Sequence, residues 1–211
     1  MDLTFIRQGY KDKGLDKEDL NTDPVIQFES WFEEAKKSEP IPTAMSLSTV
    51  NNNGEPTLRT VLLKLFDKKG FVFFTNYKSR KADHITNHPN VAVLFTWVAM
   101  ERQVSISGIA EKIKTIESIK YFMSRPRGSQ LGAWDSDQSS VLSSRKILEL
   151  KLEEIKRKFS DGEIPLPDFW GGYRIIPKTF EFWQGRPNRL HDRFIYSKQS
   201  NELWEIDRIA P

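Results

Sequence analysis

Cysteine is absent from the 211-residue sequence, and histidine is scarce, with only three residues. Without cysteine the chain can form no disulfide and has neither a thiolate nucleophile nor a thiolate metal ligand. The three histidines show no HExxH-type spacing, which argues against a metal site. A serine triad and a paired-carboxylate motif are also missing, so the chain is poor in nucleophiles of its own. Demanding chemistry in such a chain points to a cofactor.

Long apolar runs are missing as well. No stretch approaches the length of a membrane span, and the opening residues MDLTFIRQGYKDKG lack a signal-peptide core. A cytoplasmic location is therefore the default expectation. The charge balance is nearly even, because 32 basic residues face 29 acidic ones. This small excess is weak support for nucleic-acid binding, which usually concentrates many more cations on one face.

Aromatic residues, in contrast, are plentiful. They make up 12% of the chain and include six tryptophans and fourteen phenylalanines. Flat side chains in this number suit packing against another protein surface or against a planar ligand. The length favours one domain with a sizeable core. We expect residues 1–22 to form a polar N-terminal arm and residues 23–211 to form that domain.

Strand-like segments dominate the middle and the end of the chain. AMSLSTV, LRTVLLKLF, GFVFFTN, VAVLFTWV and QVSISGIAEKI are short, rich in Val, Ile, Phe and Thr, and separated by turn residues. Further strands are expected at WGGYRIIP, TFEFWQG and ELWEIDRI. Closely spaced strands with hairpin-length links predict an antiparallel barrel or sandwich.

Helical patterns flank these strands. Asp23 and Pro24 form a helix start, and an apolar stripe follows before Pro40, made of Ile26, Phe28, Trp31, Phe32 and Ala35. A short helix is predicted after Ser79, its N-cap, and two longer helices are expected at 115–124 and 143–159. Leu148, Leu152, Ile155 and Phe159 share one face of the last of these.

Four cationic groups stand out. They are RTVLLK from Arg59 to Lys64, the helix start with Lys78, Arg80, Lys81 and the preceding Thr75, the Tyr121, Arg125 and Ser129 series, and the opening stretch with Arg7 and Tyr10. Each group alone is more consistent with a solvated surface. Together, arginine with serine, threonine and tyrosine hydroxyls is a donor set that suits phosphate oxygens. Two such sets indicate two phosphates.

Another cationic stretch reads QGRPNRLHDRF. In an extended chain Arg189, His191 and Arg193 would share one face, with Asp192 on the other. These cations would repel each other unless an anionic ligand lay between them, although a charged, solvated edge strand is equally consistent with the pattern. Trp183 nearby could stack on a planar ligand or lie in the core.

Six blocks of the sequence resemble the pyridoxine (pyridoxamine) 5′-phosphate oxidase family: RTVLLK, FFTNYKSRKADHI, ERQVSISG, YFMSRPRGSQLGAWDSDQSS, FWGGYRIIP and FEFWQGRPNRLHDR. The likeness extends from the arm to the last residues. It implies a mainly β fold with flanking helices, an FMN-binding split β-barrel, and a homodimer with FMN in two clefts at the subunit interface. The implied reaction oxidises pyridoxine or pyridoxamine 5′-phosphate to pyridoxal 5′-phosphate in vitamin B6 salvage, with O2 as acceptor and H2O2 as product.

The resemblance also implies the site residues. FMN would contact Arg59, Thr60, Val61, Leu62, Leu63, Lys64, Phe74, Thr75, Arg80, Lys81, Gln103, Gln138, Ser139, Trp183 and Arg193. The substrate would contact Arg7, Tyr10, Lys64, Tyr121, Arg125, Ser129, Arg189, Leu190 and His191, with Arg189 and His191 as the catalytic pair against its ring. Because Arg59 and Lys64 lie an odd number of positions apart, an ideal strand would place them on opposite faces, so we expect a bulge or the use of both faces.

Two other hypotheses remain open at this stage. The first is an FMN-dependent reductase on the same barrel, which takes hydride from a nicotinamide and has no vitamin B6 site. The second is a non-enzymatic module that binds nucleic acid through its basic loops, although the sequence lacks a basic stripe interleaved with exposed aromatics.

Overall fold

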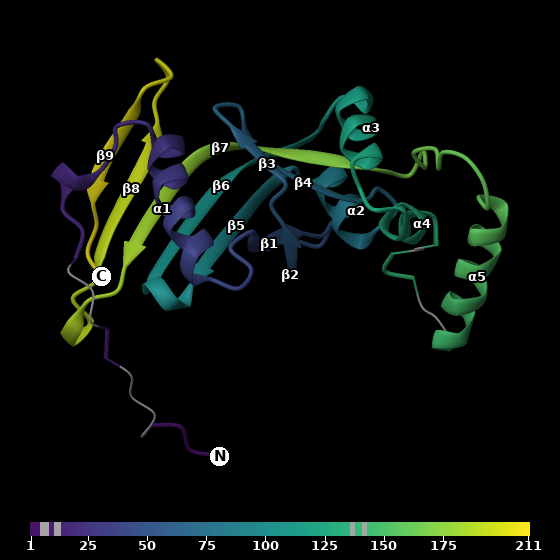
Figure 1. The fold of residues 1–211 in the computed structure, drawn as a ribbon. Helices are drawn as coiled ribbons and strands as arrows, with labels where there is room; N and C mark the ends of the chain where they lie inside the picture. The colour runs from purple at the N-terminus through teal and green to yellow at the C-terminus, as the bar shows by residue number, and fades with distance from the viewer. Residues whose placement is uncertain (5–8, 11–13, 136–137, 141–142) are drawn as a thin grey trace.

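The computed structural model describes residues 1–4, 9–10, 14–135, 138–140 and 143–211. Within these residues, one antiparallel sheet of nine strands is flanked by helices (Figure 1). The strands are β1 (Ala44–Val50), β2 (Pro56–Leu62), β3 (Leu65–Asp67), β4 (Gly70–Asn76), β5 (Asn90–Trp97), β6 (Arg102–Lys112), β7 (Trp170–Gln184), β8 (Asp192–Lys198) and β9 (Trp204–Arg208). The helices are α1 (Pro24–Ser38), α2 (Arg80–Asn87), α3 (Thr115–Met123), α4 (Arg127–Asp135) and α5 (Arg145–Lys158). The expected mainly β fold with flanking helices is confirmed.

Two residues between β2 and β3 close the sheet on itself. The strand order is β2-β1-β5-β6-β7-β4-β3, so β2 and β3, which are consecutive in the chain, lie at opposite edges. The Leu63 N–H donates to the Thr43 carbonyl beside β1, and the next N–H, of Lys64, donates to the Val72 carbonyl on β4, each at 2.8 Å. The chain thus crosses from one edge to the other here. The prediction of a single strand for LRTVLLKLF is therefore wrong. The strand is interrupted between Arg59 and Lys64, where a bulge or the use of both faces was expected.

Strand β7 connects this barrel to a C-terminal hairpin. One edge of β7 pairs with β6 along nearly its whole length, while its other edge pairs first with β4 and then, from Thr179, with β8. The two strands expected at WGGYRIIP and TFEFWQG are thus one strand of 15 residues. Its register with β6 shifts after Ser107. A Cβ on Gly108 would lie 2.1 Å from the Ile176 carbonyl oxygen, so this position requires glycine.

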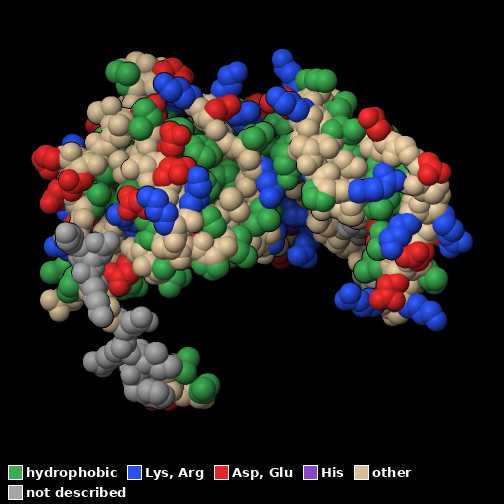
Figure 2. All heavy atoms as spheres, viewed as in Figure 1, with side chains coloured by type: hydrophobic (Ala, Val, Ile, Leu, Met, Phe, Trp, Pro, Cys, Tyr) green, Lys and Arg blue, Asp and Glu red, His purple; other side chains and the backbone are tan. Residues whose placement is uncertain are grey.

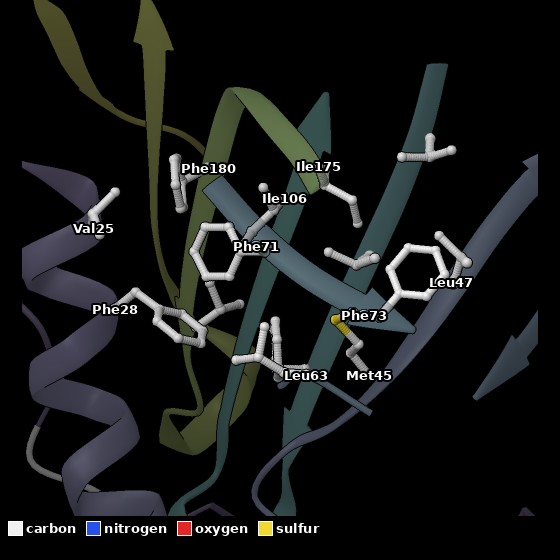
Figure 3. Packing of buried hydrophobic residues seen from close by; sticks show 14 of the residues in the cluster. Val25, Phe28, Met45, Leu47, Leu63, Phe71, Phe73, Ile106, Ile175 and Phe180 are labelled. Atoms are coloured by element: carbon white, nitrogen blue, oxygen red, sulfur yellow. The ribbon is translucent and has the colours of Figure 1, made fainter. Parts of the chain in front are cut away.

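Helix α1 covers the sheet and supplies much of its core. The Asp23 side chain accepts from the Val25 N–H at 2.9 Å and caps the helix as expected. Phe28 points from α1 toward Phe71 of the sheet (Figure 3). Its ring contacts the rings of Phe66, Phe71 and Phe95, with centroids 4.9 to 5.1 Å away. The expected apolar stripe is largely confirmed, but Ile26 is 42% exposed, because it lies on the far side of the helix.

Four helices cover the other end of the barrel. The short helix after Ser79 and the helices expected at 115–124 and 143–159 are present as α2, α3 and α5, whereas α4 was not expected. Gly128 and Gly132 give α4 a weak helical pattern. Leu152 and Ile155 of α5, and Phe159 directly after it, pack against a second buried cluster that includes Phe122 and Trp170. Among the described residues, no helix is long and apolar enough to cross a membrane.

We expect Phe28→Ala to lower the free energy of unfolding by about 3–5 kcal/mol, because a ring with no exposed surface leaves a cavity that the surrounding aromatic rings cannot fill. Ile26→Ala, on the exposed side of the same helix, should change it by less than about 0.5 kcal/mol. Equilibrium urea unfolding measures both. Equal losses for the two variants would contradict the packing described for α1.

Candidate functional site

A cleft of about 430 Å³ opens between the ends of β2 and β4, the α3–α4 turn and the start of β7. Figure 2 shows the underside of the molecule hollowed between the barrel and the α5 side, with Lys and Arg side chains in the hollow. Eleven of the expected site residues line the cleft: Thr60, Val61, Leu62, Lys64, Phe74, Thr75, Lys81, Tyr121, Arg125, Ser129 and Gln138. Sequence analysis missed four more lining residues, namely Asn76, Gly132, Ala133 and Trp170.

Lys81 is a buried cation in the wall of this cleft. It lies in the first turn of α2 and is 8% exposed. Its Nζ donates to Gln138 Oε1 at 2.7 Å, to Thr75 Oγ1 at 3.1 Å and to Ser79 Oγ at 3.3 Å. Burial, together with the charges of Arg59 and Arg80, lowers the pKa of Lys81 to about 8. Lys81 forms no ion pair within the described part of the chain. An anion in the cleft would therefore stabilise its protonated form.

Arg59 adds a second cation directly behind the wall. Its guanidinium is held from three sides, because it donates to the Leu47 carbonyl at 3.0 Å, to Thr49 Oγ1 at 2.6 Å and to Thr57 Oγ1. Burial and the nearby charge of Arg80 lower its pKa. Every group that binds Arg59 here is neutral, so its charge is left available to a ligand.

Aromatic rings and a third cation form another part of the cleft. Phe74 stacks against Tyr121, with centroids 4.0 Å apart, and against Trp170, at 5.3 Å, and these two rings lie 6.2 Å from each other. The Arg125 guanidinium lies 4.8 Å from the centre of the Trp170 ring. Burial lowers the pKa of Arg125 and raises that of Tyr121. The buried NH1 of Arg125 has no hydrogen-bond partner among the described residues.

The Tyr121, Arg125 and Ser129 series reaches the same cleft, though not along one helix. Tyr121 belongs to α3, Ser129 belongs to α4, and Arg125 lies in the turn between the two helices. The spacing of four residues therefore predicted that these three residues lie together, although not along one helix. Pro126, which cannot donate a backbone hydrogen bond, separates the two helices.

A second group of expected residues gathers at the far end of β7. The rings of Tyr10, Trp183 and His191 lie within 4.6 to 5.5 Å of one another. The Arg186 N–H donates to Nδ1 of His191 at 3.1 Å, so a neutral His191 carries its proton on Nε2. We call Tyr10, Gln103, Trp183, Arg189, Leu190, His191 and Arg193 the β7-end group. None of them lines the cleft of the same chain.

The extended conformation expected for 189–194 is wrong. Pro187–Arg189 forms a 3-10 turn, Asn188 and Arg189 have φ values of 58° and 62°, and β8 begins only at Asp192. Arg189, His191 and Arg193 therefore do not share the face of one strand. The Arg193 side chain contacts Glu181 Oε1 and donates to the Ala210 carbonyl, both at 2.8 Å. Its charge is thus balanced within the chain.

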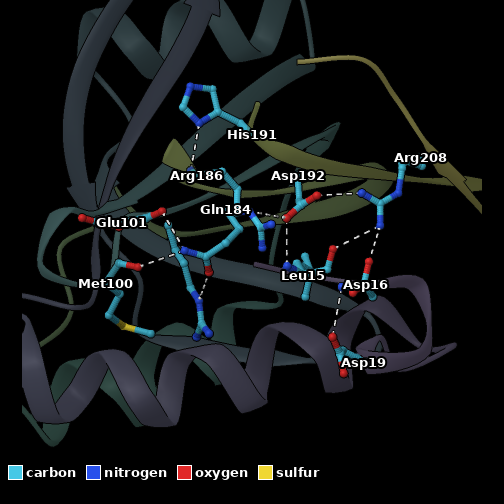
Figure 4. Close-up of polar contacts among 11 residues, drawn as sticks. Leu15, Asp16, Asp19, Met100, Glu101, Gln184, Arg186, His191, Asp192 and Arg208 are labelled. Carbon is cyan, nitrogen blue, oxygen red and sulfur yellow. Dashed lines mark hydrogen bonds and ion pairs between the residues drawn. The ribbon is translucent and has the colours of Figure 1, made fainter. Parts of the chain in front are cut away.

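Asp192 anchors the described part of the arm beside this group (Figure 4). Its carboxylate accepts from the Leu15 N–H at 2.9 Å and from Arg208 NH1 at 2.6 Å. Arg208 also donates to Asp16 Oδ1 at 2.8 Å. These bonds hold Leu15 and Asp16 of the arm against β8 and β9. Arg7, the other arm residue expected at the site, lies outside the described residues.

Four expected residues lie beside the cleft rather than in its lining or in the β7-end group. Arg59 and Arg80 act on Lys81 through their charges. Ser139 follows Gln138 and has a φ of 76°. Leu63 is 3% exposed and belongs to the core, so at most its backbone is available to a ligand.

Inorganic phosphate should stabilise the protein through Lys81. An anion that binds only the folded state, at a concentration about 100 times its dissociation constant, raises the free energy of unfolding by about 2.7 kcal/mol. We expect Lys81→Met to lose most of this gain, and Lys37→Met, which removes an exposed lysine of α1, to keep it. The gain should also shrink above about pH 8, where Lys81 loses its proton. Thermal melts in phosphate against chloride at equal ionic strength test this, and an unchanged gain in Lys81→Met would contradict it.

Comparison with known proteins agrees with this geometry. Residues 32–159 match the family model described as pyridoxamine 5′-phosphate oxidase, and residues 170–211 match the pyridoxine 5′-phosphate oxidase C-terminal dimerisation region. Proteins named pyridoxine/pyridoxamine 5′-phosphate oxidase are similar over all of this chain and all of their own length, at 62% identity in Rippkaea orientalis and 57% in Aliarcobacter butzleri.

Solved structures extend the likeness to the fold. PhzG from Burkholderia lata, solved with tetrahydrophenazine-1-carboxylic acid, matches with a TM-score of 0.87 and 26% identity, over 94% of this chain and 98% of its own. A pyridoxamine 5′-phosphate oxidase-related, FMN-binding protein from Nostoc punctiforme matches at 0.73 and 17% identity, over 91% of this chain and 100% of its own. The split barrel, the cleft residues and the matches along the chain lead to one conclusion: this protein belongs to the pyridoxamine 5′-phosphate oxidase family.

Proposed function

We propose that this protein oxidises pyridoxine 5′-phosphate and pyridoxamine 5′-phosphate to pyridoxal 5′-phosphate, using FMN, with O2 as the electron acceptor and H2O2 as the product. With the amine substrate, water hydrolyses the resulting imine to the aldehyde and ammonia leaves. The observation that carries the proposal is a cleft with two groups of phosphate donors, Lys81 with Arg59 and Arg125 with Tyr121, none of which pairs with a carboxylate among the described residues. The names of the full-length relatives support the substrate.

The residues around Lys81 fit the phosphate of FMN. Lys81, Arg59 and Arg80 bring three positive charges together, and the Thr75 hydroxyl lies 3.1 Å from Lys81 Nζ. A phosphate dianion would offset the burial that lowers the pKa of Lys81, because an opposite charge nearby favours the protonated form. The remaining wall from Thr60 to Leu62 would contact the rest of the cofactor.

The residues around Arg125 fit the phosphate of the substrate. A phosphate oxygen would satisfy the buried NH1 of Arg125, and Lys64, Tyr121 and Ser129 offer further donors in the same cleft. The stacked rings of Phe74 and Trp170 hold Tyr121 and Arg125 in place. An apolar wall also strengthens charge-assisted bonds, because it excludes water.

A second copy of the chain would complete the cleft. The match of residues 170–211 to a dimerisation region supports a homodimer. In one chain the β7-end group lies apart from the cleft, although the resemblance assigns both groups to one site. We therefore assign Trp183, Arg189 and His191 to the cleft of the partner, where they would lie against the flavin and the substrate ring.

The chain itself contributes positioning and charge. Bound FMN would supply the redox chemistry, accepting a hydride from the C4′ carbon of the substrate and passing the electrons to O2. The Arg125 group would fix the phosphate and thereby the distance of C4′ from the cofactor, which is where most of the rate enhancement is expected. His191, with Nδ1 engaged by a backbone N–H, would present its Nε2–H to the substrate.

Anaerobic addition of pyridoxine 5′-phosphate to the purified, FMN-loaded protein should bleach the visible flavin absorbance, and air should restore it. Bleaching by a nicotinamide but not by pyridoxine 5′-phosphate would favour the reductase hypothesis. A protein that cannot be loaded with FMN would refute the assignment of the Lys81 group.

Mixing two inactive variants tests the shared cleft. Arg125→Ala and Arg189→Ala should each abolish most activity, but a mixed dimer would keep one cleft with both arginines. Random reassociation of equal amounts should therefore restore about a quarter of the wild-type activity, since half of the dimers are mixed and half of their clefts are intact. No recovery, in dimers shown to have exchanged subunits, would place both arginines in the cleft of one chain.

A further inference from the structure

We propose that His84 is a positioning residue for Arg59 and makes FMN binding weaken in mild acid. Its neutral imidazole aligns the two threonine hydroxyls that hold the Arg59 guanidinium, and protonation removes that alignment. The inference rests on the proposed function, because it takes the Arg59 and Lys81 group as the binding site for the FMN phosphate.

The geometry links His84 to Arg59 through two hydroxyls. His84 Nδ1 lies 3.1 Å from Thr49 Oγ1 and 3.3 Å from Thr57 Oγ1, and the two oxygens lie 3.2 Å apart. The guanidinium donates to both of these oxygens. Thr49 has no exposed surface and His84 is 4% exposed, so water cannot easily replace either partner. His84 belongs to α2, whereas both threonines and Arg59 belong to the β1–β2 hairpin.

Counting protons gives the state of His84. Each threonine oxygen already accepts from Arg59, and each hydroxyl has one proton to donate. Thr57 can donate to the Thr49 carbonyl at 3.3 Å, which leaves His84 Nδ1 as the nearest acceptor for Thr49. We therefore assign Nδ1 as the acceptor of this hydrogen bond, at 3.1 Å, and place the ring proton on Nε2. A protonated His84 could no longer accept the Thr49 proton, and it would place a second positive charge near the Arg59 guanidinium.

The charges around His84 also favour its neutral form. Burial is the main cause of its lowered pKa, followed by Arg59 on β2. On α2 itself, Arg80 and His88 lower the pKa further, while Asp83 raises it. A base whose pKa is lower in the folded state supports the folded arrangement above its ordinary pKa, near 6.5, and loses that support as the pH falls through the lowered value. The grip on Arg59 should therefore loosen only on the acid side of neutrality.

Two substitutions of His84 distinguish its role as a hydrogen-bond acceptor from the effect of its protonation. His84→Asn places an amide oxygen near the position of Nδ1 and keeps an acceptor that does not titrate. His84→Leu removes the acceptor. His88→Asn is the matched control, since His88 is an exposed histidine at the end of the same helix.

The experiment is a titration of the full-length FMN-free protein with FMN and, separately, with riboflavin, which lacks the phosphate. Quenching of flavin fluorescence gives dissociation constants at pH 7.5 and pH 5.5. Lowering the pH from 7.5 to 5.5 should weaken FMN binding in the wild type and in His88→Asn. We expect this weakening to be about fivefold larger than in His84→Asn, which corresponds to the loss of about one hydrogen bond. His84→Leu should bind FMN weakly at both pH values. Riboflavin binding should be the same in all four proteins.

Comparing the wild type with His84→Asn removes the effects of other groups that gain or lose protons between the two pH values. Protonation of the FMN phosphate and of Lys81 affects every variant alike, so only the difference between the wild type and His84→Asn reports on His84. An equal pH ratio in these two proteins, with FMN bound by both, would overturn the inference alone. A wild type that binds no FMN would overturn the proposed function and this inference with it. If His84→Leu fails to fold, the His84→Asn comparison still decides.

Discussion

Strand β7 is the element on which the rest of the structure depends, because its two edges serve different partners. The edge facing β6 is paired almost throughout, whereas the opposite edge pairs with β4 and then with β8. Its first residue, Trp170, packs in the cleft against Phe74, and Trp183 near its other end lies against His191. One continuous hydrogen-bonded ladder thus holds the two groups of expected site residues apart within a chain.

Partly buried cations without an acidic partner make this site unfavourable for the stability of the fold. Lys81, Arg59 and Arg125 are partly or largely removed from water without a carboxylate partner in the described residues, and burial lowers the pKa of all three. Such groups destabilise a fold unless a ligand supplies the opposite charge. The aromatic core under α1 is large enough to tolerate this, as Phe28 and its neighbouring rings indicate. The same arrangement makes ligand binding and stability depend on each other.

The neutral groups behind Arg59 explain how its guanidinium can remain charged and still be fixed in place. Two hydroxyls and a carbonyl hold it without neutralising it, and the His84 imidazole contacts the two hydroxyls. A carboxylate in the same place would have bound Arg59 more strongly, but it would have competed with an anionic ligand. Because neutral acceptors hold Arg59, its positive charge still contributes to the electrostatic potential of the cleft.

Local patterns in the sequence determined most of the secondary structure, because alternation, apolar stripes and caps are short-range signals. The Asp23 cap, the strands of the barrel and the helices α1, α2, α3 and α5 follow from them, while α4 was hidden by its two glycines. The residue types of the cleft were also readable, since arginine, lysine and hydroxyl clusters suit phosphate wherever they lie. Only the tertiary structure decided that the chain changes sheet edge at Leu63 and Lys64, that 187–189 turns instead of extending, and that His84 contacts the threonine hydroxyls that hold Arg59. These features depend on contacts between segments far apart in the chain, and no local pattern of residues carries that information.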